Sequence, residues 1–275
     1  DNGDVYVTGY FYDGDNADIT GFASLTPNTA IDMYVAKYAA PGGVSWIRQF
    51  GNDVGGNTTD NTGFDLAIGW DCNLIVTGKY DNSINLDGIT LNSGNTKTGF
   101  LMKLDKDNGN VLAAANLVSG NSFHAVAVSG ATGQIYTMSK DETTAPDHTV
   151  VVQQFDENLG ILDTETCGVV AGDLLFSLTD DITRGIAVDA SDNVYITMNL
   201  TATLFNFGTT PTVTLSSGGC VAKFNSSLSP VTGRNLTTNN SYTVVRDIVA
   251  ETSGVTFVVG NTSSTIQVSQ LPAAL

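Results

Sequence analysis

Short apolar runs recur along the whole chain, separated by clusters of Gly, Asn, Asp, Ser and Pro. Runs of about four to eight residues bounded by such turn formers predict β-strands. Since no stretch of useful length carries the helical period, we predict an all-β fold. The clearest run returns five times and aligns without gaps, at Asp4–Gly9, Asn73–Gly78, Gln134–Ser139, Asn193–Met198 and Val255–Gly260.

The central residues of these five copies define a repeat. They are Tyr6, Ile75, Tyr136, Tyr195 and Phe257, and they follow one another at spacings of 69, 61, 59 and 62 residues. A fixed period of this size is the sequence signature of a repeat architecture, in which each unit packs against its neighbours.

Three further strands recur in the same phase. The strand upstream of each copy except the first is rich in Val, Ile and Ala, as expected of a strand buried on both faces. Its copies are Phe64–Ile68, Phe123–Val128, Arg184–Val188 and Arg246–Ala250. A third strand alternates apolar and polar residues, at Met33–Tyr38, Phe100–Leu104, Val150–Phe155 and Cys220–Phe224. A fourth follows after turn residues, at Val44–Phe50, Val111–Leu117, Ile161–Thr166 and Val231–Leu236.

Each repeat therefore predicts a four-stranded antiparallel meander. Radial stacking of such meanders buries both faces, so the predicted fold is a β-propeller with a repeat of about sixty residues. A string of β-sandwiches is disfavoured because each would need about seven strands and roughly 100 residues. We predict one propeller domain over 1–275, with blade-like repeats near 1–62, 63–122, 123–182, 183–244 and a partial repeat at 245–275.

The second strand occurs five times and each of the other strands four times. This mismatch predicts an incomplete ring, and we interpret the chain as part of a longer one. The number of blades is left open.

The repeat resembles the bacterial β-propeller repeat called SBBP, whose units read approximately I-A-V-D, N-V-Y-V-T-G, F-V-A-K-L-D and W-x-K-Q-F-G. The likeness is strongest over Asp4–Tyr10, Met33–Tyr38 and Ser45–Gly51, and over Gly185–Asp189 with Asn193–Ile196. It is weakest at Val150–Phe155, which lacks the Ala-Lys pair. The resemblance implies a secreted or surface protein, and it brings no active site with it.

The charge of the chain narrows the range of partners. Asp and Glu number 28 against 11 Lys and Arg, which gives a formal net charge of −17. Such a field repels phosphate backbones and anionic lipids, so we expect neither nucleic acid nor membrane insertion. The polarity comes mainly from Asn, Thr, Ser and Gly, a composition that suits an extracellular protein.

The three cysteines, Cys72, Cys167 and Cys220, are widely separated and form no C-x-x-C motif. At most one disulfide could form. We favour buried free thiols, because free Cys behaves as a small hydrophobic residue. Their disulfide state stays open at this point.

Two acidic segments resemble the opening of a calcium loop, Asp13–Asp18 and Asp105–Gly109. Neither has the distal Glu of an EF-hand loop. Each falls where the repeat places a connection between strands, so turn chemistry explains them without a metal. We therefore expect no cofactor, with calcium as the alternative.

No catalytic residue is assigned. His124 and His148 are not within motif distance of each other, and no H-E-x-x-H, G-x-S-x-G or phosphate-binding loop occurs. Carboxylates from different repeats could still converge on a propeller axis, as in glycosidases. The acidic residues on or beside first strands are Asp65, Asp180, Asp181, Asp189, Asp247 and Glu251.

Our leading hypothesis is a non-catalytic, extracellular structural or adhesive propeller that binds a protein or a cell surface. The longest connections, Gly51–Gly63 and Gly168–Thr183, are its predicted contact face. One alternative is a carbohydrate-binding or carbohydrate-active propeller using Trp46 or Trp70, although both tryptophans are also explained as strand residues packed between blades. Another is self-assembly, as a subunit of an extracellular filament.

Overall fold

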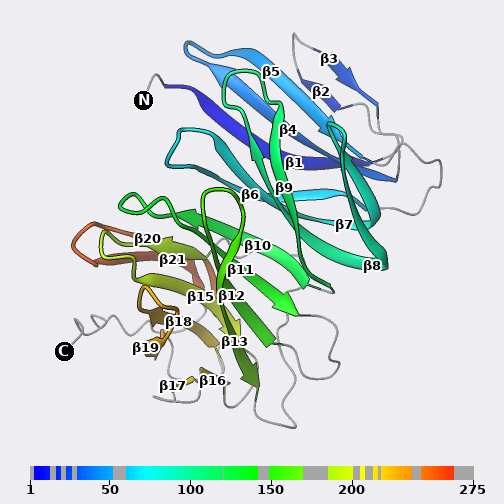
Figure 1. Cartoon of the computed structure of the whole chain (residues 1–275). Helices are drawn as coiled ribbons and strands as arrows, with labels where there is room; N and C mark the ends of the chain where they lie inside the picture. The colour runs from blue at the N-terminus through cyan, green and yellow to red at the C-terminus, as the bar shows by residue number, and fades with distance from the viewer. Residues whose placement is uncertain are drawn as a thin grey trace. The chain divides into compact units, whose positions relative to one another are not determined.

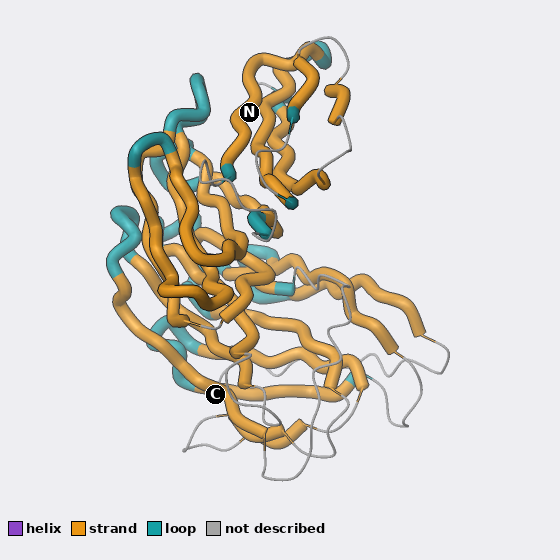
Figure 2. Tube along the Cα trace, turned by 90° about the vertical axis from the view of Figure 1, so that its right-hand side faces the viewer, coloured by secondary structure: helices purple, strands orange, loops and turns teal. Residues whose placement is uncertain are grey.

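The architecture comes from a computed structural model of the chain. It describes residues 3–12, 17–19, 23–26, 30–51, 60–119, 121–141, 149–169, 185–200, 205–207, 213–215, 218–236 and 243–262. These residues form strands and the turns between them, and no helix (Figure 2). Accordingly, this part of the chain holds no helix long and apolar enough to cross a membrane. The all-β prediction is confirmed.

The chain divides into two compact units, Asp1–Phe123 and His124–Leu275 (Figure 1). The first unit contains two main sheets. Sheet 1 has the order β1-β4-β5, and sheet 2 has the order β6-β7-β8-β9. Their strands are β1 (Val5–Tyr12), β4 (Ile31–Ala39), β5 (Gly43–Phe50), β6 (Thr62–Ile68), β7 (Leu74–Leu86), β8 (Ile89–Leu104) and β9 (Val111–Ser119). A separate small hairpin pairs β2 (Ala17–Ile19) with β3 (Ala23–Leu25).

The second unit begins within β10 and contains three sheets. Sheet 3 runs β10-β11-β12-β13 and continues into β16-β17; sheet 4 runs β14-β15-β18-β19; sheet 5 is the pair β20-β21. The bounds are β10 (Asn121–Val128), β11 (Ile135–Asp141), β12 (Thr149–Phe155), β13 (Ile161–Val169), β14 (Ile186–Val188), β15 (Val194–Leu200), β16 (Phe205–Phe207), β17 (Val213–Leu215), β18 (Gly218–Phe224), β19 (Pro230–Asn235), β20 (Thr243–Ala250) and β21 (Thr256–Thr262).

The register of the second and third strands is the same in every sheet that has both. The paired residues are Tyr6 with Lys37, Ile75 with Lys103, Tyr136 with Gln154, and Tyr195 with Lys223. Because side chains alternate between faces, a shift of one residue would send each of these side chains to the opposite face. The repeat alignment and the antiparallel meander are therefore confirmed.

The sequence pattern did not predict the short hairpins between second and third strands. Two of these hairpins reach the outermost strand of the preceding sheet. In the first unit, Gly51 forms a bridge to Asn85 at the far part of the β7–β8 hairpin. In the second unit, β13 pairs with β16 and thereby extends sheet 3 to six strands. None of the sheets formed by the described residues closes into a ring.

Each unit has its own apolar core between neighbouring sheets. In the first unit, Met33, Val35 and Phe50 of sheet 1 pack with Leu74 and Val76 of sheet 2. In the second, a cluster joins sheets 3 and 4 and includes Tyr136, Val152, Ile196, Cys220 and Phe224.

In all five repeats, the residue two positions before the second strand lies in the left-handed region. These residues are Gly3, Cys72, Gly133, Asp192 and Gly254, with φ between 59° and 80°. A turn followed by a left-handed residue suits a short hairpin, and Gly adopts this conformation without steric cost.

Cys72 occupies this turn position and is exposed, whereas Cys167 and Cys220 are buried, and all three thiols are free. The prediction of free thiols is confirmed. The prediction of burial is correct for Cys167 and Cys220 and wrong for Cys72, because its backbone lies in a surface turn.

Exchanging residues at this turn position should change stability in opposite directions. Cys72→Gly is expected to raise the free energy of unfolding by about 0.5–1 kcal/mol, because it removes left-handed strain at a site with φ of 64°. Gly254→Ala should lower it by about 1 kcal/mol, since the added Cβ would also lie 3.3 Å from the Tyr195 hydroxyl.

Urea denaturation of both variants provides the measurement, with Ala190→Gly as the matched control in an equivalent turn at negative φ. The control should lose stability through chain entropy alone. Equal effects of Cys72→Gly and Ala190→Gly would contradict the turn assignment.

Candidate functional site: the polar contacts between sheets

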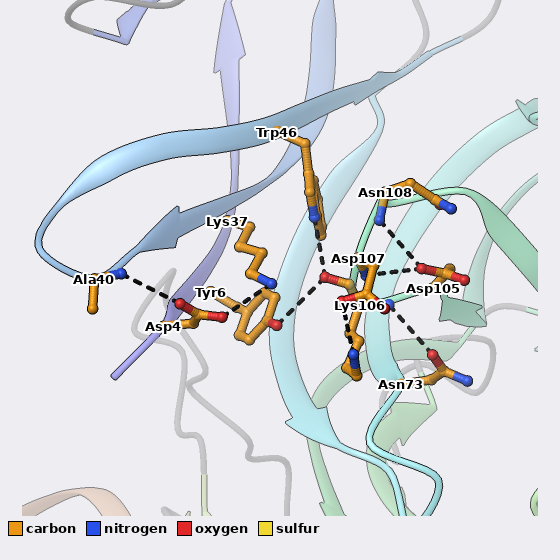
Figure 3. Close-up of polar contacts among 10 residues, drawn as sticks. All are labelled: Asp4, Tyr6, Lys37, Ala40, Trp46, Asn73, Asp105, Lys106, Asp107 and Asn108. Atoms are coloured by element: carbon orange, nitrogen blue, oxygen red, sulfur yellow. Dashed lines mark hydrogen bonds and ion pairs between the residues drawn. The ribbon is translucent and has the colours of Figure 1, made fainter. Parts of the chain in front are cut away.

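The polar side chains of the repeat gather where one sheet meets a turn of the next. In the first unit, Tyr6 and Trp46 of sheet 1 face the β8–β9 turn of sheet 2 (Figure 3). The carbonyl oxygen of Lys106 accepts hydrogen bonds from Trp46 Nε1 at 3.1 Å and from Tyr6 Oη at 3.5 Å. The Lys106 N–H donates to Asn73 Oδ1 at 3.3 Å. One turn residue therefore satisfies two aromatic donors of the neighbouring sheet.

Lys37 lies beside Tyr6 and is almost fully buried. Its Nζ is 3.0 Å from Asp4 Oδ2 and 5.4 Å from the centre of the Tyr6 ring. Burial alone would lower the pKa of Lys37, but its hydrogen bonds to Asp4 and Tyr6 outweigh that effect and raise the pKa. The hydrogen bond from Lys37 correspondingly lowers the pKa of Asp4. Lys37 is thus held charged, with its ammonium group already occupied.

The segment 105–109 is a hairpin turn, as predicted. Asp105 Oδ1 accepts the N–H groups of Asp107 at 2.8 Å and Asn108 at 3.2 Å. Gly109 has φ of 72°, and a Cβ there would lie 2.8 Å from the Trp46 ring. Only glycine allows the ring to pack so closely against this turn.

The calcium alternative gains no support from the residues described. They contain no group of three or more His, Cys, Asp or Glu side chains that could hold a metal ion. Asp13–Asn16 of the other acidic segment lie outside the described residues.

Sheet 3 uses glutamine in place of the Lys of this contact. Gln154 Nε2 donates to Gln134 Oε1 at 2.7 Å, to Tyr136 Oη at 3.0 Å and to Ser226 O of the β18–β19 turn at 3.4 Å. The contact again reaches the turn between third and fourth strands of the following sheet. Beside it, Ser129 Oγ donates to Asp192 Oδ1. Sheet 3 lacks the Ala-Lys pair, and Gln154 donates the hydrogen bond that joins sheet 3 to sheet 4.

Sheet 4 repeats the aromatic arrangement. Tyr195 is buried, and its Oη lies 2.9 Å from Asp189 Oδ2 and 3.4 Å from Gly254 O of the β20–β21 turn. Lys223 Nζ stands 5.3 Å from the centre of the Tyr195 ring. The Tyr195 hydroxyl therefore connects the β14–β15 turn of sheet 4, which holds Asp189, with the β20–β21 turn of sheet 5.

Asp189 is held as a carboxylate by local donors. It accepts the N–H of Ser191 at 2.8 Å and of Asn193 at 3.0 Å, and the Asn193 side chain at 2.9 Å. Burial would raise the pKa of Asp189, but these bonds together with that of Tyr195 hold the pKa below the ordinary value of an aspartate. The Asp189 carboxylate therefore stabilises the β14–β15 turn by accepting its N–H groups.

The other candidate catalytic carboxylates in the described residues also accept hydrogen bonds from residues one or two positions away in the sequence. Asp65 and Asp247 each accept the N–H of the following residue, at 2.9 and 2.8 Å. Glu251 lies in the β20–β21 turn, where Ser253 Oγ donates to it at 3.5 Å. His124 lies on β10, as predicted, but its side chain is not described. Residues 52–59, 142–148 and 170–184 lie outside the description, and with them most of both long connections, His148 and the pair Asp180–Asp181.

The two tryptophans have different environments. Trp46 is buried between sheets 1 and 2, as predicted. Trp70 is 59% exposed in the β6–β7 turn, so its assignment to a strand packed between blades was wrong. It lies two residues beyond the end of β6 at Ile68, where its ring is exposed.

Neither buried thiol is suited to nucleophilic or redox chemistry. Burial raises the pKa of Cys220 to about 12 and that of Cys167 well above its ordinary value. A thiol becomes reactive as the thiolate, which these surroundings disfavour. Both buried thiols therefore act as apolar packing residues. The partners that sequence reasoning missed are the turn carbonyls of Lys106, Ser226 and Gly254, because a backbone carbonyl leaves no signal in the sequence.

Comparison with known proteins gives one distant relationship and no family. No protein-family model matches the chain. It is 32% identical over 90 residues to an uncharacterized WD repeat-containing protein, L264, of Acanthamoeba polyphaga mimivirus. The match covers 30% of this chain and 6% of that protein, so the chain corresponds to a small part of this relative. This similarity and the many-stranded sheets fit a repeat β-propeller-like family.

Removing the Tyr195 hydroxyl should weaken the connection between sheets 4 and 5. Tyr195→Phe is expected to lower the free energy of unfolding by about 1–2 kcal/mol, because Asp189 and the Gly254 carbonyl lose a buried donor. The matched control is Tyr10→Phe, at a side chain that is exposed, with an expected change below about 0.5 kcal/mol. Equal losses in urea denaturation of the two variants would contradict the assigned role.

Asp189 should also contribute a pH-dependent part of the stability. Its folded pKa is below the unfolded value, so the ionised form stabilises the fold above about pH 4 and this stabilisation is lost as the pH falls through the folded pKa. Asp189→Asn should therefore be less stable than the parent at pH 7, and the difference should shrink toward pH 2. A difference that stays constant across this range would refute the contribution.

Proposed function

We propose that the chain is a β-propeller module of the SBBP type that works without catalysis, as an extracellular structural or adhesive protein that binds other proteins. The observation that carries this proposal is that the repeated polar residues of the chain bond to other parts of the scaffold. In sheets 1, 3 and 4, the residue pair at the shared register contacts a turn of the next sheet. These side chains build the scaffold and are not available to a substrate.

The residues behind the SBBP resemblance are the ones that join the sheets. Tyr6, Lys37 and Trp46 come from three different motif segments and meet at one place beside Lys106. This convergence supports interpreting the motif as a packing signature between blades. Binding then belongs to the connections and outer faces, which a rigid scaffold presents to partners.

The location outside the cell is part of the same proposal. It rests on the net charge of −17 and on a polarity supplied mainly by Asn, Thr, Ser and Gly. Carbohydrate binding is a second candidate, favoured by the exposed ring of Trp70, since an exposed aromatic face can stack on a sugar.

A paired binding and turnover experiment tests these functions. The purified chain is screened against a panel of extracellular proteins and a glycan array, and incubated with polysaccharide and peptide mixtures. We expect saturable binding to a protein, unchanged in Trp70→Ala, and no hydrolysis. Surface location is measured separately, as the access of antibody and protease to the chain on intact cells.

Each alternative has its own result. Glycan binding that Trp70→Ala abolishes, without any protein hit, would replace the proposal with the carbohydrate function. Hydrolysis that Asp65→Asn or Asp189→Asn abolishes would overturn it in favour of an enzyme. A chain protected from antibody and protease on intact cells would exclude the extracellular location.

A further inference from the structure

The hairpin between the second and third strands of sheet 2 is longer than a turn requires. Strands β7 and β8 shift register partway and then pair on to Leu86 and Ile89, next to the hairpin turn. We call residues 82–93 of this hairpin the strap of sheet 2. Asn85 of the strap forms a bridge to Gly51, which directly follows β5 of sheet 1. The strap thus belongs to sheet 2 and is bonded to sheet 1.

Apolar side chains hold the strap in place. Ile84 and Leu86 are 0% exposed and Leu91 is 7% exposed. All three belong to the same buried cluster as Met33 and Phe50 of sheet 1. Lifting the strap would return their apolar surface to water, which costs free energy in proportion to the area exposed.

A charged contact fastens the turn of the strap. Arg48 Nη2 of β5 donates to both carboxylate oxygens of Asp87. The Val111 N–H, at the start of β9, donates to Asp87 Oδ2 at 3.2 Å. Arg48 Nη1 also donates to Asn110 Oδ1 at 3.3 Å. Because hydrogen bonds between charged groups are stronger than neutral ones, Asp87 links the outermost strands of sheets 1 and 2 firmly.

Sheet 4 has a strap of the same kind, the hairpin β16–β17. Asn206 of β16 pairs with Gly168 of β13 in sheet 3, as Asn85 does with Gly51. In both straps the asparagine stands between two apolar residues and opposite a glycine. Leu215 of β17 is 1% exposed and lies in the cluster that joins sheets 3 and 4. The strap is therefore a recurring device that fastens a sheet to the one before it.

The same connection is much shorter in repeat 3. Beyond the shared register it spans 79–99 in repeat 2 and 199–219 in repeat 4, 21 residues each, but 140–150, 11 residues, in repeat 3. Ten fewer residues shorten a hairpin by five residue pairs, or about 17 Å. The division of the chain into the units Asp1–Phe123 and His124–Leu275 falls at the start of repeat 3.

We propose that the straps decide which sheets unfold together. Sheets 1 and 2 form one cooperative unit and sheets 3 and 4 belong to another, because the connection of repeat 3 lacks the length of a strap. In repeat proteins, stability is a sum of terms for repeats and for their contacts, so the chain separates where a stabilising contact is missing. Two units that open separately then replace the single domain predicted over 1–275.

The test is native-state hydrogen exchange of the whole chain in rising urea, measured by mass spectrometry on peptides. Amides of β4, β7 and β8 should converge on one free energy of opening, and amides of β12, β15 and β18 on a different one. Convergence of all these amides on a single value overturns the proposal. Separate values for sheet 1 and sheet 2 in the parent chain overturn it as well.

A point variant tests the role of the strap. Arg48→Met removes the charged partner of Asp87 and keeps an apolar stem. Amides of sheet 1 should exchange roughly threefold to tenfold faster, while those of sheets 3 and 4 stay unchanged. The matched control is Lys97→Met in the same hairpin, where Nζ lies 3.9 Å from Asp60 Oδ2 in an exposed ion pair, and its effect should stay below about twofold. Equal effects of the two variants would show that the strap does not couple the sheets.

Removing the strap gives the larger effect. Replacing residues 82–96 by Asn-Gly closes β7 and β8 with a two-residue turn between the paired residues Asp81 and Lys97. Amides of sheet 1 should then open at a lower free energy than those of sheet 2, as two separate steps. Sheets that still open together would overturn the proposal. Near-UV circular dichroism shows whether this shortened chain folds, and if it does not, the comparison of Arg48→Met with Lys97→Met decides.

Discussion

In sheets 3 and 4, the structure depends on burying the central residue of the second strand against the next sheet. Where that residue is tyrosine and fully buried, as Tyr136 and Tyr195 are, its hydroxyl needs a partner that an apolar interface does not supply. The partners come from a cross-strand Gln154 in one case and from Asp189 with the Gly254 carbonyl in the other. Polar satisfaction and apolar packing therefore occur at the same place, and neighbouring sheets cannot separate without leaving buried polar groups unpaired.

Several charged groups and thiols of the described residues also take part in this packing. Lys37 forms an ion pair with Asp4 and Lys103 with Asp71, while the carboxylate of Asp189 fixes a turn. Deep burial keeps the thiols of Cys167 and Cys220 protonated. These side chains, which look reactive in the sequence, contact other residues of the scaffold.

The residue at the central position changes with its surroundings. In sheet 2 it is Ile75, which has no hydroxyl, and the paired Lys103 instead forms an ion pair with Asp71 at 2.7 Å. In sheet 5 it is Phe257, on a face that stays open. The position is thus constrained to be large and apolar, and the need for a hydrogen-bond partner arises only with tyrosine.

The sequence by itself determined the strands, their period, the turns and the antiparallel meander, because alternation and turn residues are local properties of the chain. The pairing of Tyr6 with Lys37 and of its counterparts came from the structure. The sequence also located the contact residues Tyr6, Lys37 and Trp46 through the SBBP resemblance, without showing that they meet at the Lys106 carbonyl. Only the tertiary structure decided that hairpins reach back to the preceding sheet, that Gln154 can replace a lysine, that Trp70 and Cys72 lie at the surface while Trp46 is buried, and that one face of sheet 5 is uncovered. Those outcomes depend on which segment lies opposite a given side chain, and contacts between residues far apart in the chain leave no periodic signal in the sequence.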